Sequence, residues 1–133
     1  MKKGFVIVLL LTVVLISCRK RTEAPVLKSV LVGSEWRVNK FDIAGTDYAL
    51  LYRGMKFVFN ADSSMKITDG TATYDGKWEA DESARTFTML IKSTRYEFTL
   101  MSTEWDIYLK TPNQVQFQDD LYSPNQKLWF GKW

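Results

Sequence analysis

Apolar and polar residues alternate in short runs through the chain from about residue 35 onward. A period of two places apolar side chains on one face of a strand, whereas a helix needs a period near 3.6. Strands are predicted at residues 35–42, 55–60, 65–68, 72–79, 86–91, 95–101, 104–109, 114–118 and 127–132. A helical turn or two is predicted for residues 26–32 alone. The chain is therefore expected to be all-β.

The connections between these runs are short and rich in turn residues. Asp69-Gly70 is a strong signal for a type I′ hairpin, and Pro112 supplies the fixed φ that a turn favours. Short connections pair neighbouring strands in antiparallel fashion, and closing the meander removes its exposed edges. The predicted fold is an antiparallel up-and-down β-barrel of about eight strands, with a two-sheet β-sandwich as the alternative.

The alternation also assigns an interior made almost entirely of large residues. Its expected members are Trp36, Val38, Met55, Phe57, Phe59, Tyr74, Trp78, Phe87, Met89, Ile91, Tyr96, Phe98, Leu100, Trp105, Ile107, Leu109, Val115, Phe117, Leu128 and Phe130. Large residues on short strands fill volume, so a small pocket at one end is expected instead of a deep, lipid-sized cavity. The candidate ligand-binding residues are Trp36, Phe57, Phe59, Tyr74, Trp78, Tyr96 and Trp105. Trp133, beyond the last alternating position, is expected to be exposed.

The N-terminus has a different pattern. Lys2 and Lys3 precede an apolar run, residues 5–16, that is shorter than the roughly 20 residues a transmembrane helix needs. The sequence Leu15-Ile16-Ser17-Cys18 at its end resembles the bacterial lipobox. The resemblance implies attachment of diacylglycerol to the Cys18 sulfur, cleavage after Ser17 and acylation of the new amino group.

These patterns divide the chain into three parts. Residues 1–17 are expected to form a lipoprotein signal peptide, residues 18–28 a lipidated tether, and residues 29–133 one barrel domain. The membrane is then a partner through the lipid anchor, because two or more acyl chains give stable attachment. The basic run Arg19-Lys20-Arg21 either attracts anionic headgroups or serves as a solvated spacer.

A family resemblance rests on four fragments in order. They are Leu31-Val32-Gly33-Ser34-Glu35-Trp36-Arg37-Val38, Phe57-Val58-Phe59-Asn60-Ala61-Asp62, Gly76-Lys77-Trp78-Glu79-Ala80-Asp81 and Trp105-Asp106-Ile107-Tyr108-Leu109. Behind a lipobox, this order resembles the lipocalin-like domains of Bacteroidota lipoproteins. The resemblance implies a calycin-type barrel with no generally assigned activity. In that group acidic residues after the cysteine accompany surface export, so the basic run here favours an outer-membrane protein that faces the periplasm.

Charge and composition argue against two function classes. From Ser29 onward the chain has 12 basic and 14 acidic residues, and the cations are scattered, so nucleic-acid binding is disfavoured. The chain has no histidine, and its one cysteine is the lipidation candidate. The adjacent carboxylates Asp81-Glu82 and Asp119-Asp120 fall in turn-like stretches, where solvated charge is expected. No enzymatic activity, cofactor or metal site is predicted.

Two functions remain open at this point. The barrel is expected to be a non-catalytic binding module for a small apolar ligand, and the alternative is a structural or inhibitory domain that binds another protein of the cell envelope. An empty interior would favour the ligand-binding module. A filled interior with exposed apolar residues would favour protein interaction.

Overall fold

The computed structural model of the protein describes residues 25–119 and 125–133. The predicted signal peptide and Cys18 lie outside these residues. The strands are β1 (Glu35–Ile43), β2 (Thr46–Asp47), β3 (Met55–Phe59), β4 (Ser64–Asp69), β5 (Ala72–Asp81), β6 (Thr86–Ile91), β7 (Glu104–Lys110), β8 (Gln114–Asp119) and β9 (Gln126–Lys132). The short helices are α1 (Leu27–Leu31), the 3-10 helix η1 (Ala49–Tyr52) and α2 (Tyr96–Met101). The chain is all-β, as predicted.

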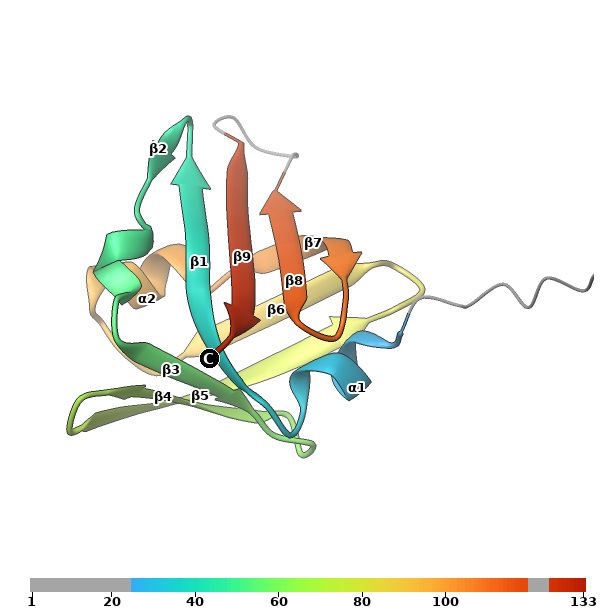
Figure 1. Ribbon diagram of the computed structural model, residues 1–133, viewed down its shortest axis with the longest axis horizontal. Coiled ribbons are helices and arrows are strands. Elements are labelled where there is room, and N and C mark those ends of the chain that lie inside the picture. Colours follow the sequence, from blue (N-terminus) through green and yellow to red (C-terminus); the bar gives the residue numbers. More distant parts are fainter. Residues whose placement is uncertain (1–24, 120–124) are drawn as a thin grey trace, which may run out of the picture.

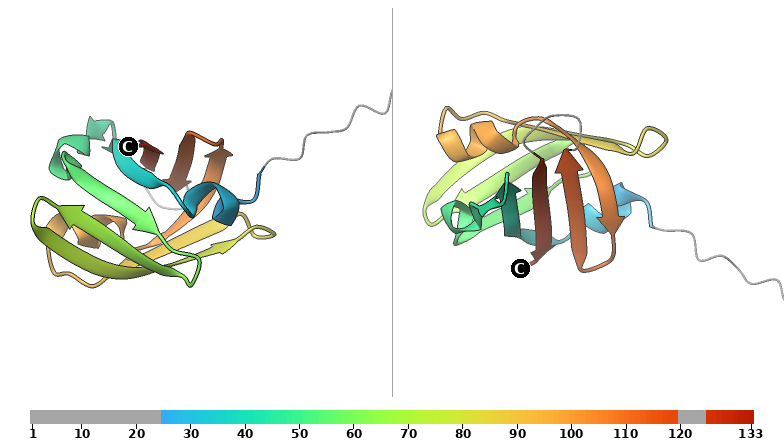
Figure 2. Two further views of the ribbon diagram at one scale, coloured as in Figure 1. Left: turned by 60° about the horizontal axis from the view of Figure 1, so that its bottom comes forward. Right: turned by 90° about the horizontal axis from the view of Figure 1, so that it is seen from above.

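The strands form one antiparallel sheet that closes into a barrel (Figure 1). From β3 to β9 each strand pairs with the next along the chain, and β1 pairs with both β3 and β9. The short strand β2 pairs with the C-terminal end of β1, where Ile43 lies opposite Thr46. The barrel is flattened, with β1, β8 and β9 forming one wall and β3 to β6 the other (Figure 2). The predicted up-and-down barrel is confirmed.

One predicted strand is wrong. Residues 95–101 were expected to alternate as a strand, but Tyr96–Met101 is helix α2. Its buried residues, Phe98 and Met101, are three positions apart, the spacing of one helical face, and Tyr96 is 67% exposed. Leu109 is also exposed, because a register shift between Ile107 and Leu109 in β7 interrupts the alternation.

The hairpin at Asp69-Gly70 is present, but with a different turn. Asp69 pairs with Ala72, which leaves Gly70 and Thr71 as a two-residue loop. Gly70 has a φ of 59° and is the only one of the two with positive φ. A type I′ turn needs positive φ at both positions, whereas type II′ needs it at the first alone. The turn therefore follows the type II′ pattern.

Aromatic rings fill the interior of the barrel. Phe87 and Phe117 stack with their centroids 4.4 Å apart. Phe59 makes edge contacts with Trp78, Phe87 and Phe130 at 5.8 to 6.0 Å. Even Gly76 leaves no space, because an added Cβ would lie 2.9 Å from Cγ of Met65. The interior is packed by side chains, as the sequence predicts.

Helix α1 covers one end of the barrel, and its packing starts earlier than the expected domain boundary. The tether was expected to reach residue 28, but Leu27 and Leu31 are fully buried. The Trp36 indole N–H donates to the Leu31 carbonyl over 3.0 Å, which joins the helix to the start of β1. The packed domain therefore includes Leu27.

The start of α1 is held by a carboxylate from another element. Glu82, in the turn that follows β5, accepts a hydrogen bond from the Leu27 backbone N–H and forms an ion pair with Lys110 of β7 at 2.6 Å. Burial alone would raise the pKa of Glu82, but the hydrogen bonds from Lys110 and Leu27, with the Lys110 charge, lower it below its ordinary value. Ionised Glu82 thus fastens α1 to the barrel.

Replacing Phe130 by Ala should lower the free energy of unfolding by about 3–5 kcal/mol, because the buried ring contacts three other rings and would leave a cavity. Urea denaturation would measure the change. The control Leu90→Ala alters an exposed side chain of β6 and should stay within about 0.5 kcal/mol of the unmodified protein. Equal effects from the two substitutions would contradict a tightly packed interior.

The variant Glu82→Gln keeps an oxygen that can accept from the Leu27 N–H but loses the charge. Because the folded-state pKa of Glu82 is lowered, its ionised form stabilises the fold above its unfolded pKa of about 4.3, and this contribution is lost as the pH falls through the folded-state value. The unmodified protein should therefore be more stable than the variant by about 1 kcal/mol at neutral pH, with a difference that shrinks below about pH 5.

Denaturation at several pH values would test this difference. Glu104→Gln, at an exposed carboxylate, is the matched control and should show little difference at any pH. A difference for Glu82→Gln that does not vary with pH would count against the charge contribution.

Candidate functional site

The seven candidate ligand-binding residues do not gather around an open mouth. Five of them are buried in the interior: Trp36, Phe57, Phe59, Trp78 and Trp105. Tyr74 is half-buried and Tyr96 is exposed on α2. Trp78 borders a pocket of about 290 Å³ that opens outward beside Lys77, Thr88 and Leu90. The structure thus places most of these aromatic residues in the core.

Both ends of the barrel are covered by short helices. Helix α1 lies over the end that contains Trp36, while η1 and α2 lie over the opposite end (Figure 1). There the Trp105 indole N–H donates to the Met101 carbonyl of α2 over 3.1 Å. Tyr52 of η1 packs its ring 5.4 Å from Phe41. The short helices at the two ends explain why Trp36 and Trp105 are shielded from solvent.

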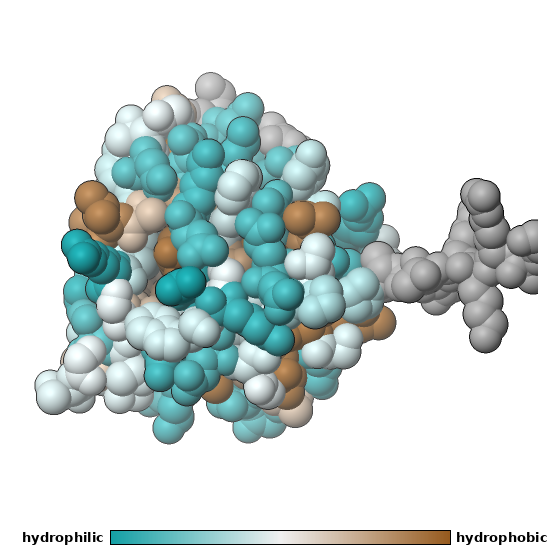
Figure 3. Space-filling model, in the orientation of Figure 1, coloured by the Kyte–Doolittle hydropathy of each residue, from teal (hydrophilic) through white to brown (hydrophobic). Residues whose placement is uncertain are grey.

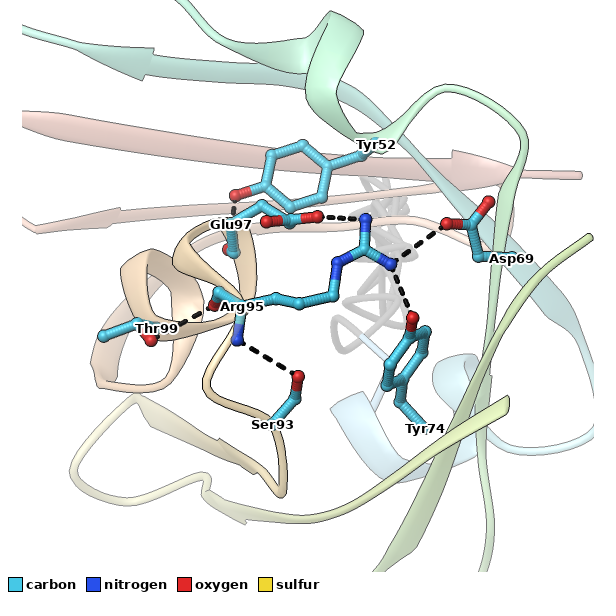
Figure 4. A network of polar contacts seen from close by, with 7 residues as sticks. All are labelled: Tyr52, Asp69, Tyr74, Ser93, Arg95, Glu97 and Thr99. Atoms are coloured by element: carbon cyan, nitrogen blue, oxygen red, sulfur yellow. Dashed lines mark hydrogen bonds and ion pairs between the residues drawn. The ribbon is translucent and has the colours of Figure 1, made fainter. Parts of the chain in front are cut away.

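A polar network centred on Arg95 joins α2 to the hairpin of β4 and β5 (Figure 4). Arg95 Nη1 lies 3.2 Å from the Asp69 carboxylate and 2.6 Å from the Tyr74 hydroxyl. Its other terminal nitrogen forms an ion pair with Glu97. The guanidinium also lies 5.3 Å from the centre of the Phe98 ring. The arginine thus holds a loop, a strand and a helix together.

Two members of this network, Arg95 and Tyr52, have raised pKa values. Hydrogen bonds with Tyr74 and then Asp69 raise the pKa of Arg95 above its ordinary value. Burial, and then the charge of Glu97, raise the pKa of Tyr52, whose hydroxyl donates to the Glu97 carbonyl over 2.6 Å. A permanent cation and a neutral phenol cannot exchange protons near neutral pH. The contacts of the network connect η1 and α2 to the β4–β5 hairpin.

A groove on the outer surface has a different character. It has a volume of about 330 Å³ and is lined by Arg37, Val38, Ala49, Leu50, Tyr52, Arg53, Gly54 and Trp133. We call it the η1 groove. Leu50 is 79% exposed, and Trp133, as expected from the sequence, is 51% exposed. Apolar residues gather over η1 on the face shown in Figure 3.

The local sequence explains why η1 presents Leu50 to solvent. The Asp47 carboxylate accepts hydrogen bonds from the backbone N–H groups of Phe41, at 3.1 Å, and Ala49, at 2.9 Å. These bonds fix the start of the 3-10 turn. Tyr52 then points inward as the buried residue of η1, which leaves Leu50 and Leu51 outside.

The charges at the η1 groove are unbalanced. Among the residues that the structure describes, Arg37 and Arg53 have no ion pair. Lys56 nearby is paired with Glu35 at 3.1 Å and lies 5.1 Å from the Trp133 ring centre. The groove therefore combines exposed apolar side chains with two available cations.

The sequence did not identify this groove. No element was predicted between residues 42 and 55, so the apolar pair Leu50-Leu51 fell in a presumed loop. The available signal was the apolar run Ala49-Leu50-Leu51 in a segment with no predicted element, because exposed apolar clusters in loops are associated with interaction surfaces.

The described residues offer no metal centre. No group of three or more histidine, cysteine, aspartate or glutamate residues within 25–119 and 125–133 could hold a metal ion. In the same part of the chain, no helix is both long and apolar enough to cross a membrane.

Comparisons with known proteins support the fold. No protein-family model matches the sequence, and no curated protein matches it. The chain is similar in structure to a crystal structure of a DUF4847 family protein from Bacteroides vulgatus, with a TM-score of 0.62 and 15% sequence identity. The match covers 80% of this chain and 96% of the other. At this identity the likeness establishes the antiparallel barrel fold and no activity.

Proposed function

We propose that this protein is a lipid-anchored, non-catalytic domain of the bacterial cell envelope that binds another protein through the η1 groove. The observation that carries the proposal is a filled interior combined with exposed apolar residues on the outer surface. Buried aromatic residues cannot contact a ligand without displacing their neighbours. Exposed Leu50, Leu51 and Trp133 can contact a partner at no such cost.

The lipid anchor is the second part of the proposal. It is supported by the lipobox pattern that ends in Cys18 and by the basic and apolar segments before it. With the anchor, the domain would be held at the outer membrane and face the periplasm. A domain held there meets partners that share the same surface, so modest affinity is sufficient.

The groove indicates the chemistry of the partner. Arg37 and Arg53 would pair with carboxylates, and Leu50 and Trp133 would contact large apolar side chains. An extended or helical segment that carries both acidic and apolar residues fits this surface. The small apolar ligand expected from the sequence becomes the second candidate, since five of its seven proposed contacts are buried.

Peptides that pair Asp or Glu with Phe or Leu should bind the purified domain, whereas peptides of equal length with Lys in the acidic positions should not. The double variant Arg37→Ala/Arg53→Ala and the variant Trp133→Ala should each weaken binding about tenfold, the effect of losing about 1.4 kcal/mol. Isothermal titration calorimetry would measure the affinities.

Leu90→Ala is the matched control, because Leu90 is an exposed leucine of β6 that does not line the η1 groove. Binding that is equally strong with acidic and basic peptides, or that Leu90→Ala reduces as much as Trp133→Ala, would refute the assignment.

Cys18→Ala should release the protein from membranes, because no other cysteine is present to accept the lipid. Detergent phase partitioning of the unmodified protein and the variant would show the change. Ser17→Ala keeps a small residue before the cysteine and serves as the control. A Cys18→Ala protein that still partitions with the detergent phase would refute lipid anchoring.

A further inference from the structure

A second group of exposed apolar residues lies where the packed chain begins. Val26 is 53% exposed, Tyr108 is 61% exposed and Leu109 is 37% exposed. Tyr108 and Leu109 line a pocket of about 420 Å³ together with Glu82, Arg85, Ile107 and Lys110. We call Val26, Tyr108, Leu109, Arg85 and Lys110 the tether-end patch.

The contacts of Glu82 place these residues together. Glu82 binds the backbone N–H of Leu27, the neighbour of Val26, and the ammonium of Lys110, the neighbour of Leu109. Figure 3 shows apolar residues at this side of the molecule, near the start of α1 and the end of β7. The patch therefore surrounds the point at which the chain enters the fold.

A bulge in β7 makes the patch apolar. In a regular strand one of two consecutive residues faces the core, but the register shifts between Ile107 and Leu109. Ile107 remains buried, while Tyr108 and Leu109 both face solvent. The irregularity thus exposes two consecutive large side chains that a regular strand would divide between its faces.

The covalent chain limits how far this patch can be from Cys18. Seven peptide units connect Cys18 to Pro25, and at most about 3.3–3.6 Å per residue gives a reach of roughly 25 Å. A lipid on Cys18 would therefore hold the α1 end of the barrel close to the bilayer. The opposite end, with η1 and α2, would be farther from it (Figure 1).

The charge that would attract anionic headgroups lies mainly in the segment between Cys18 and Pro25. Arg85 and Lys110 flank the apolar residues, and Arg19, Lys20 and Arg21 lie in the intervening segment of the sequence. The Lys110 charge is already paired with Glu82, and Asp81 stays ionised because the Ala84 N–H and Ser83 hydrogen-bond its carboxylate and lower its pKa. The net positive charge of the region therefore comes from the basic run Arg19-Lys20-Arg21. Each basic residue near an anionic surface contributes about 1 kcal/mol.

We propose that the tether-end patch rests on the bilayer that holds the lipid anchor, with Tyr108 and Leu109 at the headgroup level. This inference rests on the lipid anchor of the proposed function. Tyrosine is suited to such an interface because its ring is apolar and its hydroxyl is polar. The contact would orient the barrel with the η1 groove directed toward the periplasm.

Hydroxyl-radical footprinting tests the orientation independently of lipidation in cells. The chain from Cys18 onward is coupled through its single thiol to a maleimide lipid in vesicles of phosphatidylcholine, with or without phosphatidylglycerol. Oxidation of Tyr108 and Leu109 should fall by about threefold or more on tethering, because a lipid interface excludes water from side chains inserted in it. Protection should be greater with phosphatidylglycerol.

Internal controls are present in the same protein. Leu50 and Tyr96 are exposed at the opposite end and should oxidise at the same rate with and without tethering. Val26 should also be protected on tethering. The variant Tyr108→Ser/Leu109→Ser should lose this protection of Val26, whereas Leu90→Ser should retain it. Unchanged oxidation of Tyr108 on tethering, or protection of Tyr96 in its place, would overturn the inference.

The footprinting experiment and the test of lipid anchoring can fail independently of each other. Because the maleimide lipid supplies the attachment, the footprint can support the orientation even if Cys18 is not lipidated in cells. Conversely, a Cys18→Ala protein released from membranes would support the anchor even where the footprint is negative.

Discussion

The pairing of β1 with β9 is the constraint on which the rest of the structure depends. These strands come from opposite ends of the described chain, and their ladder runs from Trp36 opposite Lys132 to Ile43 opposite Gln126. Without it the meander would have two open edges and an exposed apolar face. With it, rings from distant strands, such as Phe57 of β3 and Phe130 of β9, pack 5.1 Å apart. The closure also has a register shift between Val38 and Lys40, which turns Phe41 into the core.

The filled barrel decides where function can be located. Large side chains occupy the interior, and short helices cover both ends, so little of the barrel is left for a guest molecule. What remains available is the outside: the η1 groove, where the elements between β1 and β3 stand away from the sheet, and the tether-end patch, where β7 bulges. Both surfaces occur where a regular strand is interrupted. A barrel of this kind displays irregular segments on a rigid support.

The sequence predicted the regular parts of the fold well, for a physical reason. In a strand with one face in the core and one in solvent, apolar and polar residues alternate along the sequence. Met55, Phe57 and Phe59 could therefore be assigned to the core directly. Helix α2 could not be recognised in this way. Tyr96, Phe98 and Leu100 alternate like a strand, and the helix is favoured by contacts with distant residues, among them the Trp105 N–H on the Met101 carbonyl and the Tyr52 hydroxyl on the Glu97 carbonyl.

The candidate site was harder to predict than the fold. An alternating aromatic residue is equally compatible with a packed core and an open calyx, because the helices that cover the ends decide between them. Helix η1 depends on the Asp47 carboxylate and on the burial of Tyr52 by Phe41, neither of which leaves a periodic signal.

The attachment of α1 also determines how the molecule responds to mechanical load. Tension applied through the segment before Pro25 would enter the fold at α1 and reach β1 only afterwards. Side-chain packing and a few hydrogen bonds hold α1, whereas a backbone ladder along β9 secures β1. Under a rising pull, the helix would detach first and uncover Trp36 while the ring of strands stayed closed. Detachment of the five-residue helix would then lengthen the chain and relieve the tension before the barrel itself unfolds.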